Sequence, residues 1–278
     1  MATGLTRRSA APTADNDFDI DAFKARSVPV SLDDLDLTQF IDHPLDGDTL
    51  RCLRYMHDVE YHTVCYLRDL LVTPAHRDPT VTTFLTLWNV EEMYHGDAIE
   101  AVLAAHGETA GRDRVNTTRQ RLGRFDRVAP VAHSLGSLLV GPAWTAVHMT
   151  WGAVNEWTAQ AAYARLGQRA NHPVLTALLP RLMRQEGRHA DFYARQAERR
   201  LRNDARARWI TRTALRRWWG PVGSTLLPPS EVAFLARHLF SGPDGTAMTE
   251  RIDRRIDLLP GLSGLRLATG AAERLIAA

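Results

Sequence analysis

Two short motifs in the sequence combine a carboxylate with an imidazole at the same spacing. Glu92 and His95 form one Glu-x-x-His tetrad, and Glu186 and His189 form the other. Residues three apart on an α-helix project from one face, so each tetrad can grip a metal ion between its two side chains. A single tetrad arises by chance on many solvated helix faces. Two tetrads on separate helices indicate a shared metal site.

Two isolated glutamates complete a ligand set. Glu60 is the only glutamate of segment 48–72, and Glu156 lies within segment 151–162, which is mostly apolar or aromatic. Burying a carboxylate there is costly unless a cation partners it, and an arginine is the alternative to a metal ion. The order Glu, Glu-x-x-His, Glu, Glu-x-x-His along four helices is typical of di-metal carboxylate bundles. The predicted ligands are Glu60, Glu92, His95, Glu156, Glu186 and His189.

The donor set favours particular metals. Four carboxylates and two imidazoles, without a thiolate, suit iron, and manganese fits the same ligands. The negative charges of the four glutamates balance two ferrous ions. The predicted cofactor is therefore a pair of iron ions, with manganese as the alternative.

Four long helices have to position these residues. Apolar residues recur at steps of three and four over 48–72, which predicts the first helix. A loop with two prolines leads to a second helix over 80–106, which Gly107 ends as a C-cap. Helices over 143–167 and 171–203 follow, and Pro180 is expected to kink the last one.

The rest of the chain also reads as helical. A helix is expected within 131–140, ended by Gly141-Pro142, and four more are expected near 204–218, 230–240, 245–258 and 264–276. The predicted fold is all-α: a ferritin-like four-helix bundle with additional C-terminal helices. Residues 1–30 lack periodicity and are predicted to be a mobile N-terminal arm, and residues 31–278 are predicted to form one di-iron domain with a C-terminal helical extension.

Composition narrows the function classes. The formal net charge of +2 does not favour a nucleic-acid binder. No apolar run is long enough to span a membrane, and no apolar stretch follows the basic residues of the N-terminus as in a secretory signal. Cys52 and Cys65 are read as reduced thiols. These features predict a cytoplasmic protein.

The motifs resemble those of a known family. Residues 91–97, Glu-Glu-Met-Tyr-His-Gly-Asp, resemble the Glu-Glu-Asn-Arg-His-Gly-Asp motif of soluble acyl-ACP desaturases. Glu186, Arg188 and His189 match that family's Asp-Glu-Lys-Arg-His-Glu motif, Asn155-Glu156 matches its Gln-Glu-Arg-Ala-Thr motif, and Glu60 stands in place of its first-helix ligand. The resemblance spans about residues 45–205, and the length is nearest to the short actinobacterial members.

The resemblance implies an activity. A di-iron, O2-dependent oxidoreductase would act on an acyl chain bound to an acyl carrier protein, with electrons from ferredoxin or a similar donor, in a monomer or a homodimer. Four positions depart from the family. Gln185 replaces an aspartate on the path to the first histidine, Ala159 replaces a threonine linked to proton handling, and Gly187 and Ala190 replace the lysine and the final glutamate of the second motif. Residues expected to support the ligands are Gln185, Thr158 and Asp97.

A basic segment offers a dock for such a carrier. Residues 181–217 hold twelve arginines against four acids. The simpler interpretation is a solvated helix face. The functional interpretation is a surface for an acidic carrier and its phosphopantetheine phosphate, with Arg195, Arg199 and Arg200 as the candidate contacts.

Other functions on the same scaffold stay open. The departures at Gln185 and Ala159 leave room for a hydroxylase or an N-oxygenase of a small metabolite, although Leu182 lacks the extra histidine of one N-oxygenase family. A radical-generating subunit like that of ribonucleotide reductase would need a tyrosine where Ile99 stands. Iron storage, as in ferritin, would leave the C-terminal helices and the arginine face without a role.

Overall fold

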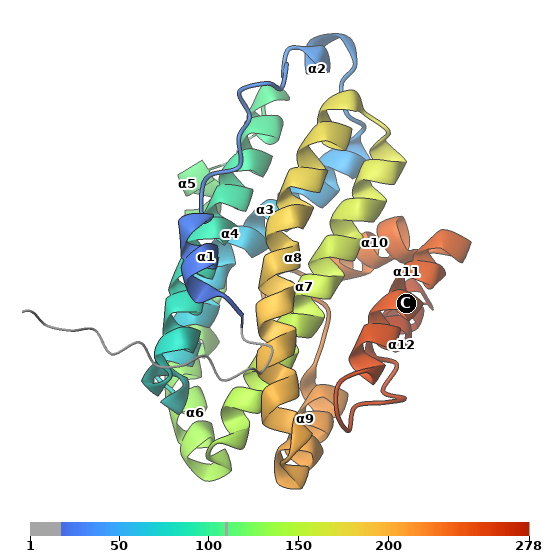
Figure 1. Ribbon diagram of the computed structural model, residues 1–278. Coiled ribbons are helices and arrows are strands. Elements are labelled where there is room, and N and C mark those ends of the chain that lie inside the picture. Colours follow the sequence, from blue (N-terminus) through green and yellow to red (C-terminus); the bar gives the residue numbers. More distant parts are fainter. Residues whose placement is uncertain (1–17, 109–110, 278) are drawn as a thin grey trace, which may run out of the picture.

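The computed structural model describes residues 18–108 and 111–277 of the chain. All regular secondary structure within these residues is helical (Figure 1). The four longest helices are α3 (Gly47–Leu71), α4 (Pro79–Ala105), α7 (Ala143–Ala170) and α8 (Pro173–Arg202). The predicted all-α class is confirmed, and these helices correspond to the four that were expected to carry the ligands.

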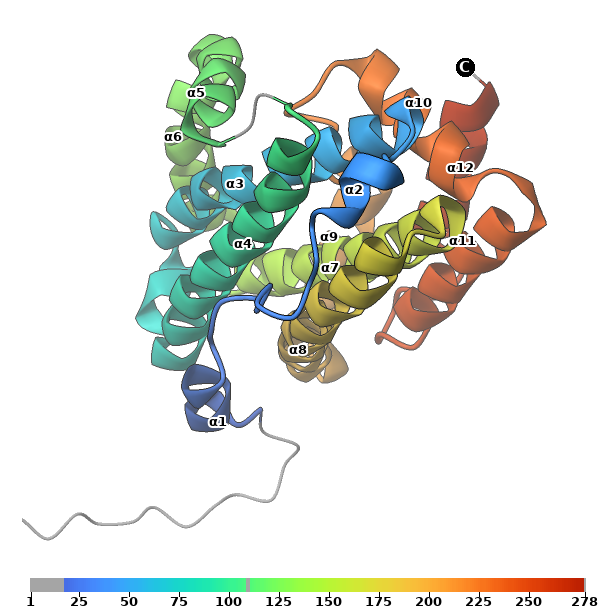
Figure 2. The same ribbon diagram turned by 90° about the horizontal axis from the view of Figure 1, so that it is seen from above.

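Two antiparallel hairpins build the bundle. Helices α3 and α4 are joined through the 3-10 helix η1 (Pro74–Arg77), and α7 and α8 are joined at Asn171, whose left-handed backbone (φ 44°) reverses the chain. Helix α3 packs against α7 and α4 packs against α8, so the hairpins lie side by side when seen from above (Figure 2).

Local sequence sets the starts of the ligand helices. The Asp46 side chain accepts a hydrogen bond from the Thr49 amide at the start of α3, at 2.7 Å. Asp78 does the same for the Thr80 and Val81 amides of α4, and Pro79 occupies the first turn. Such caps satisfy amides that have no partner within the helix, and they fix the starts of α3 and α4 within one residue of the predicted positions 48 and 80.

The predicted C-terminal helices are present and cover one side of the bundle. They are α9 (Ala205–Trp218), α10 (Pro229–Phe240), α11 (Gly242–Asp257) and α12 (Leu267–Ala277). Helices α9, α10 and α11 contact α7, α10 also contacts α3, and α12 packs against α10 and α11 (Figure 1). The face of α7 and α3 that turns away from the other ligand helices is therefore covered.

Several short elements were not expected. They are α1 (Ile20–Ala25), α2 (Gln39–Asp42), α5 (Gly111–Arg121) and the first two turns of α6 (Gly123–Val140). Residues 1–17 of the predicted arm lie outside the described residues. The boundary at residue 30 needs correction, because Phe23 of α1 is 2% exposed and lies 5.3 Å from the Phe84 ring of α4. Burial of this aromatic ring holds the segment against the bundle.

None of the described helices is both long enough and apolar enough to cross a membrane. Cys52 and Cys65 are free thiols, the former buried and the latter half-buried.

Candidate metal centre

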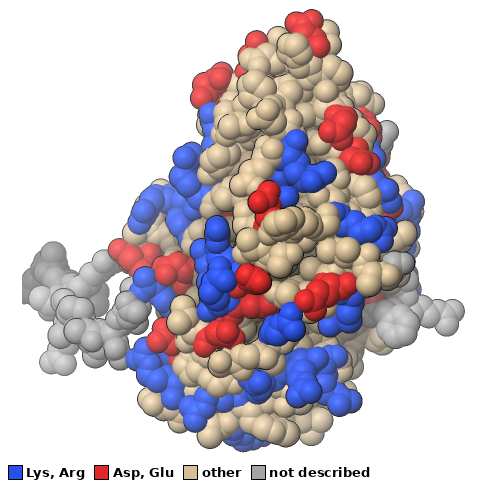
Figure 3. All heavy atoms as spheres, turned by 90° about the vertical axis from the view of Figure 1, so that its right-hand side faces the viewer, with Lys and Arg blue, Asp and Glu red and all other residues tan. Residues whose placement is uncertain are grey.

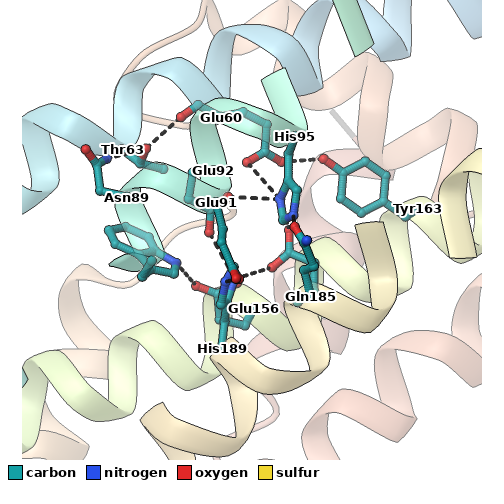
Figure 4. Close-up of polar contacts among 12 residues, drawn as sticks. Glu60, Thr63, Asn89, Glu91, Glu92, His95, Glu156, Tyr163, Gln185 and His189 are labelled. Carbon is teal, nitrogen blue, oxygen red and sulfur yellow. Dashed lines mark hydrogen bonds and ion pairs between the residues drawn. The ribbon is translucent and has the colours of Figure 1, made fainter. Parts of the chain in front are cut away.

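The structure brings all six predicted ligands together between the four long helices. All of them except Glu186 are labelled in Figure 4. Helix α3 supplies one residue, α4 two, α7 one and α8 two. Each of these residues is at most 5% exposed. These residues are Glu60, Glu92, His95, Glu156, Glu186 and His189. Four carboxylates this deep in an apolar bundle require compensating positive charge.

The six residues form two overlapping groups. Glu60 and His95 belong to the first group and Glu156 and His189 to the second, while Glu92 and Glu186 belong to both. Within each group, one ligand atom per residue lies within 4.8 Å of all the others. Each group can therefore hold a metal ion, and the two groups share a pair of carboxylates.

His95 has a geometry that fits a cation. Its Nε2 lies 2.9 Å from Oε1 of Gln185, an amide oxygen that can only accept, so Nε2 carries the hydrogen. Its Nδ1 faces the carboxylates of Glu186 and Glu92, at 3.2 and 3.3 Å, and has no hydrogen-bond partner among the described residues. A buried ring nitrogen directed into a group of carboxylates is what a metal site requires.

His189 is held by a different kind of partner. Its Nε2 lies 2.7 Å from Oε2 of Glu91, and its Nδ1 faces Glu186 at 3.2 Å. Glu91 is fully buried and also accepts a hydrogen bond of 2.8 Å from Arg188. Glu91 was not predicted to support a ligand, although its position beside Glu92 and the arginine beside His189 were available signals. One histidine thus has a neutral amide behind it and the other a carboxylate.

Two further buried residues hold the isolated glutamates. The Tyr163 hydroxyl donates to Oε1 of Glu60, and the Trp88 indole N–H donates to Oε1 of Glu156 at 3.0 Å. Both were missed as functional candidates. Tyr163 follows Glu156 by seven residues and therefore lies two turns further along the ligand face of α7, which is a signal that spacing alone could have supplied.

Mutual contact perturbs the titration of the four carboxylates. Burial raises the pKa of Glu60 and of Glu156 well above the usual value, and the nearby carboxylates raise both further. Burial acts in the same direction on Glu92 and Glu186. At Glu92, first a hydrogen bond from Glu60 and then the contacts with His189 and His95 outweigh burial and lower the pKa to about 2. At Glu186, first the charge of His95 and then a hydrogen bond from His189 lower the pKa well below its usual value.

The pKa values of both histidines are raised. Burial alone would lower the pKa of His95, but Glu186 and Glu92 raise it to about 9. The pKa of His189 is likewise raised well above its usual value, because Glu186 and Glu91 outweigh the effect of burial. Without metal, protons therefore supply the positive charge that the cluster needs.

Of the three residues that were expected to support the ligands, one contacts a ligand and two bond elsewhere. Gln185 does contact His95, and its amide nitrogen donates to the Val28 carbonyl at 3.0 Å. Asp97 does not contact the cluster: it is exposed and accepts a hydrogen bond from Tyr61. Two residues correspond to about 200° of helical rotation, which turns Asp97 away from the side of His95. The Thr158 hydroxyl bonds to the carbonyl of Val154 in its own helix, at 2.8 Å.

The three candidate carrier contacts are engaged within the chain. Arg195 pairs with Asp191 at 2.8 Å, and Arg199 and Arg200 approach Asp78 at 3.7 and 2.9 Å. Burial lowers the pKa of Arg200, and its side chain is 18% exposed. Seen from the side of α10–α12, basic side chains gather toward one end of the molecule with acidic ones among them (Figure 3). Docking of a carrier at these arginines stays a prediction.

An apolar pocket adjoins the cluster. It lies between α3, α7 and the C-terminal helices, with about 760 Å³ of empty space that is partly open to solvent, and Glu60 is one of its lining residues. Ala159 and Thr158 line it as well. The helical extension therefore forms the wall of a cavity that reaches a candidate metal ligand.

Comparison of the chain with protein-family models, curated proteins and solved structures finds no match. The likeness to acyl-ACP desaturases accordingly rests on the motifs of the sequence alone.

Proposed function

We propose that the protein is a di-iron, O2-dependent oxidoreductase that acts on an acyl chain. One observation carries the proposal: two buried Glu/His groups on four helices share Glu92 and Glu186. Sharing a pair of carboxylates suits two neighbouring cations, as in the di-iron carboxylate bundles. Oxygen and imidazole donors without thiolate favour iron, with manganese as the alternative.

The surrounding residues bind and orient the ligands. Gln185 and Glu91 accept the Nε2 hydrogens of the two histidines and leave both Nδ1 atoms directed at the shared carboxylates. Tyr163 and Trp88 hold the carboxylates of the two isolated glutamates in fixed directions. Such contacts keep ligand geometry and basicity constant. When bound and reduced, the pair of iron ions would supply activation of O2 for attack on an unactivated C–H bond.

The substrate assignment rests on the pocket and on the motif resemblance. Hydrocarbon fits a cavity whose lining is almost wholly apolar and which reaches Glu60. Desaturation of a carrier-bound acyl chain removes two hydrogen atoms from it. These two hydrogen atoms, two electrons from ferredoxin or a similar donor, and two protons reduce O2 to two molecules of water.

Hydroxylation or N-oxygenation of a small metabolite is the second candidate. The observation that favours it is Ala159, which lines the pocket beside Glu60 with a methyl group where the similar family has a hydroxyl. In this reaction one oxygen atom enters the product, and the other leaves as water with the same two electrons and two protons. Storage of iron without oxidation of a substrate is the alternative outside the enzymes.

Intact-mass analysis of the substrate separates these functions. The iron-loaded chain is incubated with acyl carrier proteins, ferredoxin, its reductase and O2. Loss of two hydrogen atoms from the acyl chain supports desaturation, and gain of one oxygen atom supports hydroxylation. Unchanged acyl chains and an iron load far above two per chain would instead indicate storage. A Glu156→Gln variant serves as the control without activity.

A further inference from the structure

The apolar pocket has a polar neighbour at its outer end. A second hollow, with about 1040 Å³ of empty space that is partly open to solvent, lies between α3, α5 and the loop that precedes α10. We call it the arginine cleft, because Arg51, Arg54, Arg114 and Arg121 line it. Tyr55 lines both the arginine cleft and the apolar pocket, so the two cavities meet at this residue.

Arginines outnumber acids among the residues that line the arginine cleft. Its four arginines face three acids, Asp58, Asp113 and Glu231. Two of these acids are already paired, Asp58 with Arg114 at 2.6 Å and Glu231 with Arg51 at 2.7 Å.

Two of the arginines keep donors for a ligand. Arg54 uses one terminal nitrogen for Glu108, at 2.8 Å, and Arg121 is exposed without an ion pair among the described residues. The positive charge also reaches Glu231, since Arg51 first and then Arg54 and Arg114 lower its pKa. An anion entering the cleft would find these donors and the same positive potential.

The apolar pocket is the opposite in character. Glu60 is the only charged residue among those that line it. Its outer wall is made of small and aliphatic side chains from the C-terminal helices, such as Ala236, Ile252 and Ala271. A hydrocarbon without polar groups matches this lining, because any polar atom placed there would lose its hydrogen bonds to water.

Helix α3 connects the two cavities. Arg51, Tyr55 and Val59 recur every four residues along one face and lead from the arginine cleft into the pocket, where Glu60 follows. At a rise of about 1.5 Å per residue, the path from Arg54 or Arg51 to Glu60 is roughly 9 to 14 Å. With carbon–carbon bonds of about 1.5 Å in a zigzag, this length corresponds to roughly seven to eleven carbon atoms.

We propose that the arginine cleft and the apolar pocket form one binding site for an amphiphile with an anionic head. The carboxylate or phosphate head lies between Arg54 and Arg121, and an unsubstituted alkyl chain passes Tyr55 to reach Glu60. The Tyr55 hydroxyl donates to the Val222 carbonyl at 2.5 Å and closes the junction, so the ring turns aside when the chain enters. Oxidation of the chain rests on the proposed function; binding of the amphiphile does not.

Calorimetric titration of the metal-loaded chain tests the proposal. The probes share a ten-carbon alkyl chain and differ in the head: decanoate, decyl phosphate, decanol and decyltrimethylammonium. The anionic probes should bind at least about tenfold more tightly than the neutral one, the worth of one charge-assisted contact. Decanoyl-phosphopantetheine tests the source of the head, since tighter binding than decanoate indicates a carrier-derived thioester and weaker binding a free acid.

Variants assign the two halves of the site. The double change Arg54→Gln and Arg121→Gln should abolish the preference for an anionic head and leave decanol binding unchanged. Arg216→Gln is the matched control, because Arg216 is exposed on α9 and lines neither cavity. Ala272→Phe, or Ala236→Leu if that variant does not fold, fills the pocket and should weaken all four probes.

Two results overturn the proposal. One is equal binding of the decanoate, decanol and ammonium probes, and the other is decanoate binding that the double arginine change leaves intact. The metal content of the same samples keeps this test separate from the proposed function. A chain that holds two irons but no amphiphile refutes this inference alone. A chain that binds decanoate but no iron refutes the proposed function alone.

Discussion

Replacing Glu91 by Gln is the most informative change to the surroundings of the metal centre. Glu91 touches no metal in the proposed arrangement, yet its Oε2 lies 2.7 Å from Nε2 of His189. The amide keeps the size of the side chain and removes its charge. The His189 side would then resemble the His95 side, where Gln185 already supplies an amide oxygen at 2.9 Å.

The expected loss of metal affinity follows from what a carboxylate behind a ligand histidine contributes. Removing a carboxylate behind a metal-bound histidine typically lowers metal affinity by about 10- to 100-fold, or roughly 1.4 to 2.7 kcal/mol. Glu91 also raises the pKa of His189, so the variant has to displace less proton when metal binds. The loss of metal affinity in the variant should therefore be smaller at pH 6 than at pH 9. At low pH, protons compete with the metal for His189 more strongly in the unchanged protein than in the variant.

Chelator competition measures this effect, with manganese or anaerobic ferrous iron as the probe. Glu231→Gln is the matched control, since Glu231 also pairs with an arginine, at 2.7 Å, and lies outside the cluster. The control should retain full affinity. If Glu91→Gln binds metal as tightly as the unchanged chain at both pH values, then Glu91 does not support a ligand and the reasoning about His189 is wrong.

Four further outcomes are expected. Metal loading at pH 7 should release up to four protons, because burial and neighbouring charges raise the pKa of Glu60, Glu156, His95 and His189. The affinity for metal should therefore rise with pH. Calorimetry in two buffers that shows no proton release would contradict this. Tyr163→Phe leaves a buried carboxyl without its donor and should lower the unfolding free energy of the metal-free protein by about 1 to 3 kcal/mol; an unchanged denaturation midpoint argues against the contact. Phe23→Ala, in α1, should cost about 3 kcal/mol in thermal unfolding, and no loss would mean that α1 does not pack on the bundle. Charge reversal at Arg199 should raise KM for a carrier-bound substrate more than it lowers kcat, whereas equal KM values would remove the basic face as a dock.

Most of the bundle could be predicted from the sequence because its signals are local. Caps such as Asp78 and breaks such as Gly141 act within a few residues, and the apolar periodicity of α3 extends over 25 residues. The short helix α1 has no such signal. It is held by contacts of Phe23 with rings of α4 and α8, which are distant in sequence.

The site residues also divide into those placed by spacing within one helix and those placed by contacts between helices. Ligand spacing within one helix placed Glu92 and His95 on a common buried face, and the structure bears this out. Spacing along one helix could have pointed to Glu91 and Tyr163 as neighbours of the ligands. Their partners, His189 and Glu60, lie on other helices, so only packing reveals which contacts form. Asp97 was misplaced because adjacency in a motif was taken as adjacency in space.

The central claim is that the buried Glu/His cluster holds two metal ions. Iron content per chain tests it most directly, measured by mass spectrometry after anaerobic loading with ferrous iron and removal of unbound metal. We expect two irons per chain. In the Glu156→Ala variant the iron content should fall while the helical content is retained. A content near zero, or one that Glu156→Ala leaves unchanged, would contradict it.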